Sequence, residues 1–361
     1  MEKQALHVSI IGGGIGGLAA ACAFQRQGIE VTVFERNPEL REIGAGLTLW
    51  ANGVQVLQQL GLADALTAVS ARLTSFECWS WRGKRLGSVR LDTLERRVGA
   101  PSLGIHRADL LRRLSGAVDR GSIHLHVHCV GFRSEQGAII SHFADGQQQQ
   151  TDLLVGADGL YSVIREQLLG KQPPRYSGYT CWRGVALFEE RHVSPGISSE
   201  TWGRGRRFGM LPIGNGRVFW YVTFNCPAGE QDREGERKKN LLRLFGSWRH
   251  PIGPLIEATD EGAILRNDLF DRPPVRHWGS GRVTLLGDAA HPPTPNLGQG
   301  ACQALEDALV LAGCFSGQRE PVAALRAYEA RRAKRSASII EQSALFGRIG
   351  QWEETLHRLS W

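Results

Sequence analysis

The chain contains 361 residues, of which 42% are hydrophobic and 22% are charged, and it carries a formal net charge of +7. This length exceeds one ordinary domain, and the basic residues are scattered without a recognition module, which argues against a nucleic-acid-binding protein. Uninterrupted apolar stretches of about 18 residues are missing, a predicted strand stands where a signal peptide would, and seven widely spaced cysteines lack a CxxC pair, so we expect a cytoplasmic protein without a transmembrane segment.

The first predicted elements are a strand, a glycine-rich turn and a helix. Residues 6–11 are apolar, and residues 18–26 form an alanine-rich helical stretch. Between them Gly12, Gly14 and Gly17 make the pattern GxGxxG. In this pattern the first glycine makes a tight turn, the second admits a pyrophosphate and the third lets the helix pack on the strand.

A second predicted strand, residues 30–34, ends at Glu35. The distance from Gly17 to Glu35 is typical of a carboxylate that holds a ribose diol. We therefore predict a bound adenine dinucleotide in preference to a merely structural glycine turn. The pattern by itself does not separate NAD from FAD.

The middle of the chain carries weaker signals. Arg107 precedes an amphipathic helix, and a charge pair with Asp109 is an alternative role for it. Apolar residues alternate over 123–127 and predict a strand. The glutamine tract at 147–150 is interpreted as a hairpin tip.

Two predicted antiparallel hairpins follow a different pattern. Residues 76–81 and 86–91 flank one glycine-containing turn, and residues 207–212 and 217–224 flank another. Aromatic side chains gather in this part of the chain and either line a pocket or pack a small core. They are Trp182, Trp202, Phe208, Phe219, Trp220 and Tyr221.

Two further acids follow apolar strands. Asp158 comes after the predicted strand 153–155, and Asp288 comes after the predicted strand 283–286. Behind Asp288, prolines and glycines form a loop that lets the backbone approach a flat ligand, and a predicted helix at 301–314 begins where this loop ends, so free amide groups face the ligand. An ordinary strand-loop-helix joint is the alternative interpretation.

The last predicted helix spans residues 321–346 and contains a basic run that we interpret as a solvated face rather than a nucleic-acid or membrane patch. The run consists of Arg331, Arg332, Lys334 and Arg335.

In their order and wording, these motifs resemble the single-component FAD-dependent aromatic-ring hydroxylases, the class A flavoprotein monooxygenases. The likeness is strongest to the salicylate hydroxylase, urate hydroxylase and zeaxanthin epoxidase branch, because the chain reads GDAAHPPTPNLGQGACQALEDA at its last motif. It extends from Val8 to about Trp352. The absence of a CxxC pair argues against the disulfide reductases, which share the first motif.

The resemblance implies an α/β fold in which a Rossmann-like FAD-binding domain is interleaved with a smaller substrate domain on a mainly antiparallel sheet, followed by C-terminal helices. We expect the FAD-binding domain at 1–70, 100–172 and 276–318, the substrate domain at 71–99 and 173–275, and the helical segment at 319–361. The implied chemistry uses tightly bound, non-covalent FAD, transient NADPH or NADH as reductant, and a flavin C4a-hydroperoxide that transfers one oxygen atom from O2 to an aromatic or heteroaromatic small molecule.

The resemblance also suggests which residues hold FAD. Arg107 matches the arginine that reaches the flavin, the backbone of Val130 matches an adenine contact, and Asp288 matches the ribityl contact. The complete expected set is Gly12, Gly14, Ile15, Gly16, Gly17, Glu35, Arg36, Arg107, Val130, Asp158, Asp288, Pro295, Gly298, Gln299, Gly300 and Ala301.

Three residues are candidates for substrate positioning. Arg207 and Arg183 carry planar guanidinium groups that suit a carboxylate or a urate-like ring, and a surface ion pair is the alternative for each. His291 is expected either to contact substrate or flavin or to make a structural hydrogen bond. No metal site is expected. A flavin oxidase or dehydrogenase, or a non-catalytic flavin-binding module, are the alternative functions. The substrate, its regiochemistry, the choice of NADH or NADPH, hydroxylation or epoxidation, and the oligomeric state stay open.

Overall fold

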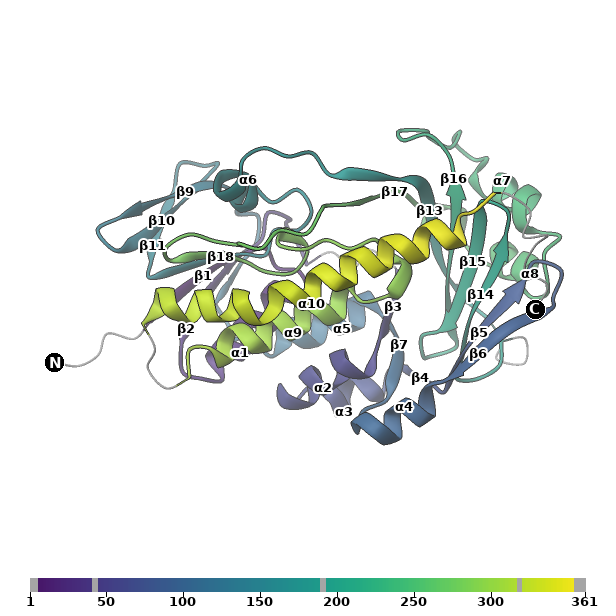
Figure 1. Ribbon diagram of the computed structural model, residues 1–361, viewed down its shortest axis with the longest axis horizontal. Coiled ribbons are helices and arrows are strands. Elements are labelled where there is room, and N and C mark those ends of the chain that lie inside the picture. The colour runs from purple at the N-terminus through teal and green to yellow at the C-terminus, as the bar shows by residue number, and fades with distance from the viewer. Residues whose placement is uncertain (1–5, 41–44, 189–192, 317–319, 354–361) are drawn as a thin grey trace.

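The computed structural model describes residues 6–40, 45–188, 193–316 and 320–353. In this part of the chain a parallel sheet and a larger, mainly antiparallel sheet form two halves of an elongated molecule (Figure 1). The α/β fold predicted from the sequence is thus confirmed. No helix in the described ranges is long and apolar enough to cross a membrane.

The parallel sheet contains the predicted dinucleotide strands. From edge to edge it consists of β18 (Val283–Leu285), β12 (Leu153–Gly156), β1 (His7–Ile11), β2 (Glu30–Phe34) and β8 (Ile123–His124). The central strands are largely apolar because both of their faces are covered. The helices α1 (Ile15–Gln25), α5 (Arg107–Gly116) and α9 (Gly300–Gly313) lie on one side of the sheet (Figure 1). The other side contacts a small antiparallel sheet, where the ring centroids of Phe34 and Phe143 are 4.6 Å apart.

A small antiparallel sheet lies beside it, formed by β9 (Cys129–Glu135), β10 (Ala138–Phe143) and β11 (Gln148–Thr151), with α6 (Val163–Leu169) packed on β9. Two sequence expectations differ here. The predicted strand at 123–127 ends after His124, since His126 takes a left-handed backbone conformation with φ 59°. The glutamine tract is mostly strand, because Gln148–Thr151 pairs with β10 and the turn lies just before it.

A second small sheet connects the two halves. It consists of β3 (Gly46–Leu49), β7 (Ser102–His106) and β4 (Ala71–Leu73), and α2 (Ala51–Gln59), α3 (Ala63–Thr67) and α4 (Leu91–Val98) lie near it.

The seven-stranded sheet forms the other half of the molecule. Its order is β17 (Leu265–Asp271), β13 (Arg175–Leu187), β16 (Arg217–Asn225), β15 (Arg206–Pro212), β14 (Ile197–Gly203), β5 (Ser75–Ser80) and β6 (Arg85–Arg90). Both predicted hairpins are present, as β5–β6 and β15–β16.

Alternation along these strands separates a core face from a cavity face. Phe208 stacks on Trp220, with ring centroids 5.7 Å apart, in the core under α7 (Arg237–Phe245) and α8 (Ile252–Glu257). Their neighbours Arg207 and Tyr221 line the large cavity instead. The two interpretations of the aromatic cluster therefore each hold for some of its rings.

One long helix, α10 (Pro321–Gly350), runs from the parallel-sheet half to the seven-stranded sheet (Figure 1). Arg331, Lys334 and Arg335 of its basic run are exposed, as expected for a solvated face. Arg332 is not: it is buried, and its Nη1 and Nε lie 2.5 Å from Glu306 and 2.6 Å from Asp307 on α9. The expected solvated face is wrong for this residue, because α10 packs on α9 at this position.

Candidate active site

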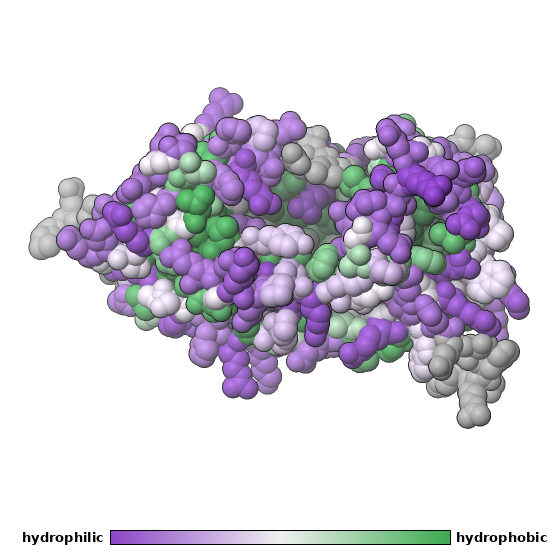
Figure 2. Space-filling model, turned by 90° about the horizontal axis from the view of Figure 1, so that it is seen from above, coloured by the Kyte–Doolittle hydropathy of each residue, from purple (hydrophilic) through white to green (hydrophobic). Residues whose placement is uncertain are grey.

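Two adjoining cavities lie along the end of the parallel sheet. The smaller, of about 200 Å³, is bounded by the glycine turn and the ends of β2 and β12. The larger, of about 540 Å³, lies between the parallel-sheet half and the seven-stranded sheet. Gly14, Ala157 and Gly159 border both, so the two cavities meet at the glycine turn. Figure 2 shows apolar side chains in a hollow between the two halves, surrounded by a mostly hydrophilic surface.

The three glycines of the turn have different steric environments. At Gly12, where φ is +112°, a Cβ would lie 2.3 Å from the carbonyl oxygen of Ala157. At Gly17 it would lie 2.0 Å from the carbonyl oxygen of Gly12. At Gly14 it would meet no atom within 4 Å and would project into open space. Gly12 and Gly17 therefore permit close backbone packing, while Gly14 leaves room for a ligand at the start of α1.

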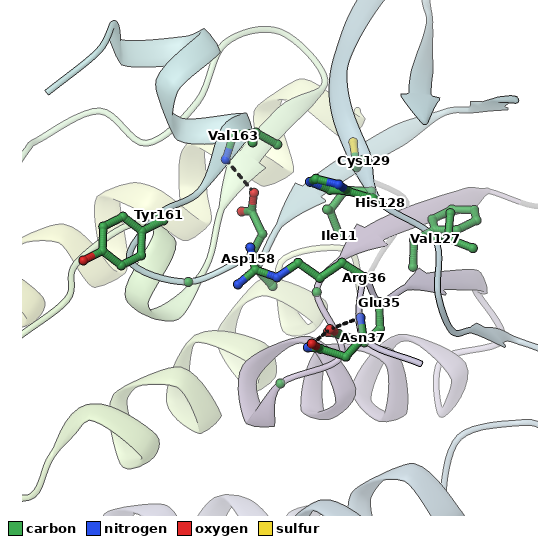
Figure 3. Close-up of a pocket in the computed structure, with 15 residues that line it drawn as sticks. Ile11, Glu35, Arg36, Asn37, Val127, His128, Cys129, Asp158, Tyr161 and Val163 are labelled. Atoms are coloured by element: carbon green, nitrogen blue, oxygen red, sulfur yellow. Dashed lines mark hydrogen bonds between the residues drawn. The ribbon is translucent and has the colours of Figure 1, made fainter. Parts of the chain in front are cut away.

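Glu35 lies at the end of β2 beside this turn (Figure 3). Its Oε2 accepts a hydrogen bond from the Gly13 amide at 2.8 Å, and its Oε1 accepts one from the Asn37 amide at 2.9 Å. Arg36 also borders the smaller cavity. The carboxylate is thus held in place next to the space that the sequence assigned to a ribose.

Val130 does not border that space. Its side chain is exposed on β9, and the preceding residues Val127, His128 and Cys129 line the smaller cavity instead. The expected contact was assigned to the Val130 backbone, and the structure brings the neighbouring segment, not Val130, to the cavity.

Only one of the two carboxylate oxygens of Asp158 has a hydrogen-bond partner in the described part of the protein. Its Oδ2 accepts a hydrogen bond from the Val163 amide at 2.8 Å (Figure 3), whereas its buried Oδ1 has no partner among the described residues. Burial raises the pKa of this carboxyl, against the effect of hydrogen bonds from Ser162 and nearby amides. A buried acceptor without a donor at a cavity wall fits a ligand that supplies the missing hydrogen bond.

Arg107 and Asp288 both line the larger cavity, and their opposite charges attract one another there. Both side chains are open to the cavity but lie deep in the molecule. Burial lowers the pKa of Arg107, and the negative charge of Asp288 acts to raise it. Burial raises the pKa of Asp288, and His291 and Arg107 act to lower it. Asp288 follows β18 in a short turn, Gly287–Ala289 (η3).

The loop after η3 forms one wall of the larger cavity. It contains a second short turn, Pro295–Leu297 (η4), after which Gly298 takes a left-handed conformation with φ +60°. The indole of Trp50 donates to the Leu297 carbonyl at 2.9 Å and holds the loop. Of the expected residues here, Pro295, Gly298, Gly300 and Ala301 line the cavity. Gln299 does not; its side chain accepts from Asn52 at 3.1 Å.

His291 lies away from both cavities. It is buried, and its Nε2 is 2.5 Å from Oδ2 of Asp307, which also accepts from the Gly287 amide. Of the two roles expected for His291, the structure shows the structural hydrogen bond. Asp307 was missed in the sequence, although an acid in the apolar helix 301–314 is a signal for a buried charged network.

Arg183 and Arg207 both line the larger cavity from the seven-stranded sheet. Arg183, on β13, is half-buried, and its Nη2 donates to Oδ1 of Asn267 at 2.7 Å. Arg207, on β15, is 1% exposed and pairs with Glu200 at 3.2 Å. A surface ion pair is thus not the environment of Arg207. Its hydrogen-bond partners are Glu200, Asn296 and Gln351. Glu200 and Gln351 had no signal in the sequence, because only the fold brings these separate segments together.

In the ranges that the structure describes, no group of three or more His, Cys, Asp or Glu side chains is arranged to hold a metal ion. A glycine turn open to a ligand, a fixed carboxylate at the next strand and an unpartnered buried acid together fit FAD. A second cavity adjoins them. This combination defines a flavoprotein with a ligand cavity next to its dinucleotide site.

Comparison with known proteins extends this class to a family. The family described as "FAD binding domain" matches residues 5–343, so the chain belongs to that family. It is 44% identical over 351 residues to aurachin C monooxygenase/isomerase of Stigmatella aurantiaca, covering 97% of this chain and 91% of that protein. It is 34% identical to the FAD-dependent urate hydroxylase of Klebsiella pneumoniae, covering 92% and 87%.

Among solved structures, Klebsiella pneumoniae HpxO complexed with FAD and uric acid superposes with a TM-score of 0.91 at 32% identity, covering 96% of this chain and 89% of that one. The predicted family resemblance and FAD as cofactor are confirmed. The protein is a member of the FAD-dependent monooxygenases, and the two alternative functions are not supported.

Proposed function

We propose that the protein uses NADPH or NADH and O2 to insert one oxygen atom into an aromatic or heteroaromatic small molecule held in the larger cavity. The observation that carries the proposal is the continuity of the two cavities at Gly14: the smaller has the dinucleotide features, and the larger has an apolar wall from a different sheet. When bound, FAD supplies the redox and oxygen-transfer chemistry.

The residues of this chain have roles in binding and positioning. In this proposal the amides at the start of α1 bind the pyrophosphate, Glu35 binds a ribose, and Asp158 accepts a hydrogen bond through its unpartnered Oδ1. Arg107 and Asp288, together with the loop 292–300, form the flavin side of the larger cavity.

The seven-stranded sheet excludes water from the other side of the larger cavity. Met210, Leu211, Phe219 and Leu269 line it there, so a flat ring can be buried against apolar surface. Exclusion of water favours oxygen transfer to the substrate over wasteful loss of the reducing equivalents.

The deciding experiment is a coupling measurement with aromatic acids, purines and quinolones as candidate substrates. For each compound, NADPH and NADH oxidation, H2O2 release and product mass under isotopically heavy O2 would be recorded. A true substrate should accelerate nicotinamide oxidation and gain one heavy oxygen atom. A product that loses hydrogen without gaining oxygen would indicate a dehydrogenase, and binding without either change would indicate a non-catalytic module.

We also propose a cytoplasmic location. The seven cysteines are all free thiols, as expected for a reducing compartment. Fractionation of cells that express the protein would test this, and recovery of the protein from an oxidising compartment would contradict it.

A further inference from the structure

Arg207 lies at the wall of the larger cavity, but protein atoms already surround its guanidinium group. Its Nη1 donates to Oε1 of Glu200 at 3.2 Å, its Nε donates to Oε1 of Gln351 at 3.0 Å, and its Nη2 donates to Oδ1 of Asn296 at 2.6 Å. Every nitrogen of the planar fork therefore has an acceptor. Only one N–H on each Nη atom is left without an acceptor among the described residues, so a carboxylate could reach Arg207 only through those two N–H groups.

Glu200, on β14, balances the charge of Arg207. Its side chain is 3% exposed and borders the same cavity. Its Oε1 also accepts from the Tyr221 hydroxyl at 2.7 Å, and its Oε2 accepts from the Trp202 indole at 2.6 Å. All three partners donate a hydrogen bond to this carboxylate. The Arg207–Glu200–Tyr221 cluster consequently carries no net charge.

Apolar side chains also line this side of the cavity; they are Met210, Leu211, Phe219, Leu269 and Phe346. Beside them the sheet contributes the hydroxyl groups of Ser198, Ser199 and Thr223 and the guanidinium of Arg183. A second anion placed beside buried Glu200 would lose its hydration and be repelled, while Arg207 is already neutralised. An uncharged carbonyl or amide would be repelled less and would cost less to desolvate.

We propose that the substrate is an uncharged aromatic or heteroaromatic compound whose polar group faces the Arg207–Glu200–Tyr221 cluster, rather than a carboxylate or another anion. The proposal rests on the proposed function and narrows its substrate class. Of the two kinds of ligand that the sequence suggested for Arg207, a carboxylate or a urate-like ring, it favours the ring with uncharged carbonyl groups. Arg183, the other cation contributed by this sheet, donates to Asn267 and is the residue through which an anion could still bind.

The test uses matched ligands that differ in charge. Naphthamide and naphthoate, and benzamide and benzoate, would be titrated calorimetrically into the FAD-loaded protein at neutral pH. The amides should bind at least about tenfold more tightly than the carboxylates, since an uncompensated buried charge is costly. Equal or tighter binding of the carboxylates would overturn the proposal, as would failure of both amides to bind.

A charge variant sharpens the test. Glu200→Gln keeps the shape of the side chain but leaves the charge of Arg207 unbalanced, so the preference should reverse toward the carboxylates. The double variant Glu200→Gln with Arg207→Gln should restore the preference for amides, which keeps the test informative if the single variant is unstable. FAD content and thermal unfolding would verify the fold of each variant. An unchanged ratio in a folded Glu200→Gln protein would contradict the role of charge balance.

Glu77 provides the matched control. It lies on the neighbouring strand β5, accepts from the Trp79 indole at 3.0 Å as Glu200 does from Trp202, and does not border the cavity. Glu77→Gln should therefore leave the ligand preference unchanged. Selective loss of carboxylate binding in Arg183→Gln, with wild-type protein preferring carboxylates, would instead identify an anion site at Arg183. Because binding is measured without turnover, a lack of oxygen insertion would overturn the proposed function alone and leave the charge preference standing.

Discussion

At the scale of single residues, two glycines of the turn have different roles: Gly17 permits close packing, and Gly14 leaves room for a ligand. Gly17→Ala would force a Cβ to within 2.0 Å of the Gly12 carbonyl oxygen, whereas Gly14→Ala would place it in open space at the junction of the cavities. We predict that Gly17→Ala destabilises the FAD-free protein, while Gly14→Ala keeps its stability and weakens FAD binding. Urea unfolding without FAD and flavin fluorescence titration would separate the two effects. Equal loss of stability in both variants would contradict this division.

Glu35→Ala should also weaken FAD retention. Glu35 is held by the Gly13 and Asn37 amides beside the cavity, so a charged hydrogen bond to ribose costs little reorganisation. Its removal should lower the affinity by about 1.5 to 3 kcal/mol. Equilibrium dialysis with FAD would measure this, and unchanged affinity would move the ribose contact to another residue.

Asp307 predicts an acid-sensitive fold. Burial acts to raise the pKa of this carboxyl, but His291 and Arg332 outweigh it and hold the pKa below its usual value. A depressed folded pKa means that its stabilisation is complete above the unfolded value, about 4, and is lost as the pH falls further through the folded value. Asp307→Asn should cost about 3 to 5 kcal/mol at neutral pH and remove part of this acid dependence.

Urea denaturation from neutral to acid pH would test that prediction. Glu341→Gln is a suitable control, since Glu341 is exposed on α10 and its loss should change stability little. A variant of Asp307 as stable as the control would contradict the importance of the network.

The residues that sequence reasoning located are those that act through local patterns. Gly12, Gly14, Glu35 and Asp158 each follow a strand at a recognisable spacing, and each borders a cavity. Glu200 and Gln351 lie far apart in sequence and meet only through the fold. No spacing rule could have joined them to Arg207.

At the scale of elements, α10 is fitted to the cavity cluster through its last turn. A Cβ at Gly350 would lie 2.8 Å from Cδ and Nε of Arg207. We predict that Gly350→Ala shifts Arg207 and weakens ligand binding, even though alanine favours helix by up to about 1 kcal/mol. Gly313→Ala on α9, where a Cβ meets no atom within 4 Å, should leave binding unchanged. Calorimetric titration with naphthamide would compare the two, and equal affinities would contradict the steric argument.

The elements were predicted well where hydrophobic periodicity was long. The strand Glu30–Phe34 agrees at both ends, and the two hairpins of the seven-stranded sheet shift by only a residue or so. The prediction for 123–127 was wrong after His124, because apolar alternation does not report the left-handed backbone at His126. Arg332 was misplaced for a related reason: a helix pattern shows charge but not the ion partners on another helix.

At the scale of the whole molecule, the cavities divide unevenly between the two halves. Residues from the parallel-sheet half and the small sheet beside it line the smaller cavity, whereas both halves line the larger. FAD should therefore stabilise the protein more than ADP does, because only FAD reaches the larger cavity. At a thousand times the dissociation constant, a ligand adds about 4 kcal/mol. Thermal unfolding with FAD and with ADP at the same free concentration would test this, because the tighter ligand then gives the larger shift. Equal shifts would show that the flavin part adds nothing.

Because the ribosome makes the chain from its N-terminus, the partners of Arg207 are synthesised at different times. A ribosome makes Glu200, Arg207, Tyr221 and Asn296 well before it reaches Gln351, the partner of the Arg207 Nε atom. The glycine turn at residues 12–17, by contrast, is made before all of these residues. Assembly of the ligand-binding wall must therefore wait for residues near the end of this sequence, and a nascent chain arrested before Gln351 would carry its dinucleotide turn but an incomplete wall around Arg207.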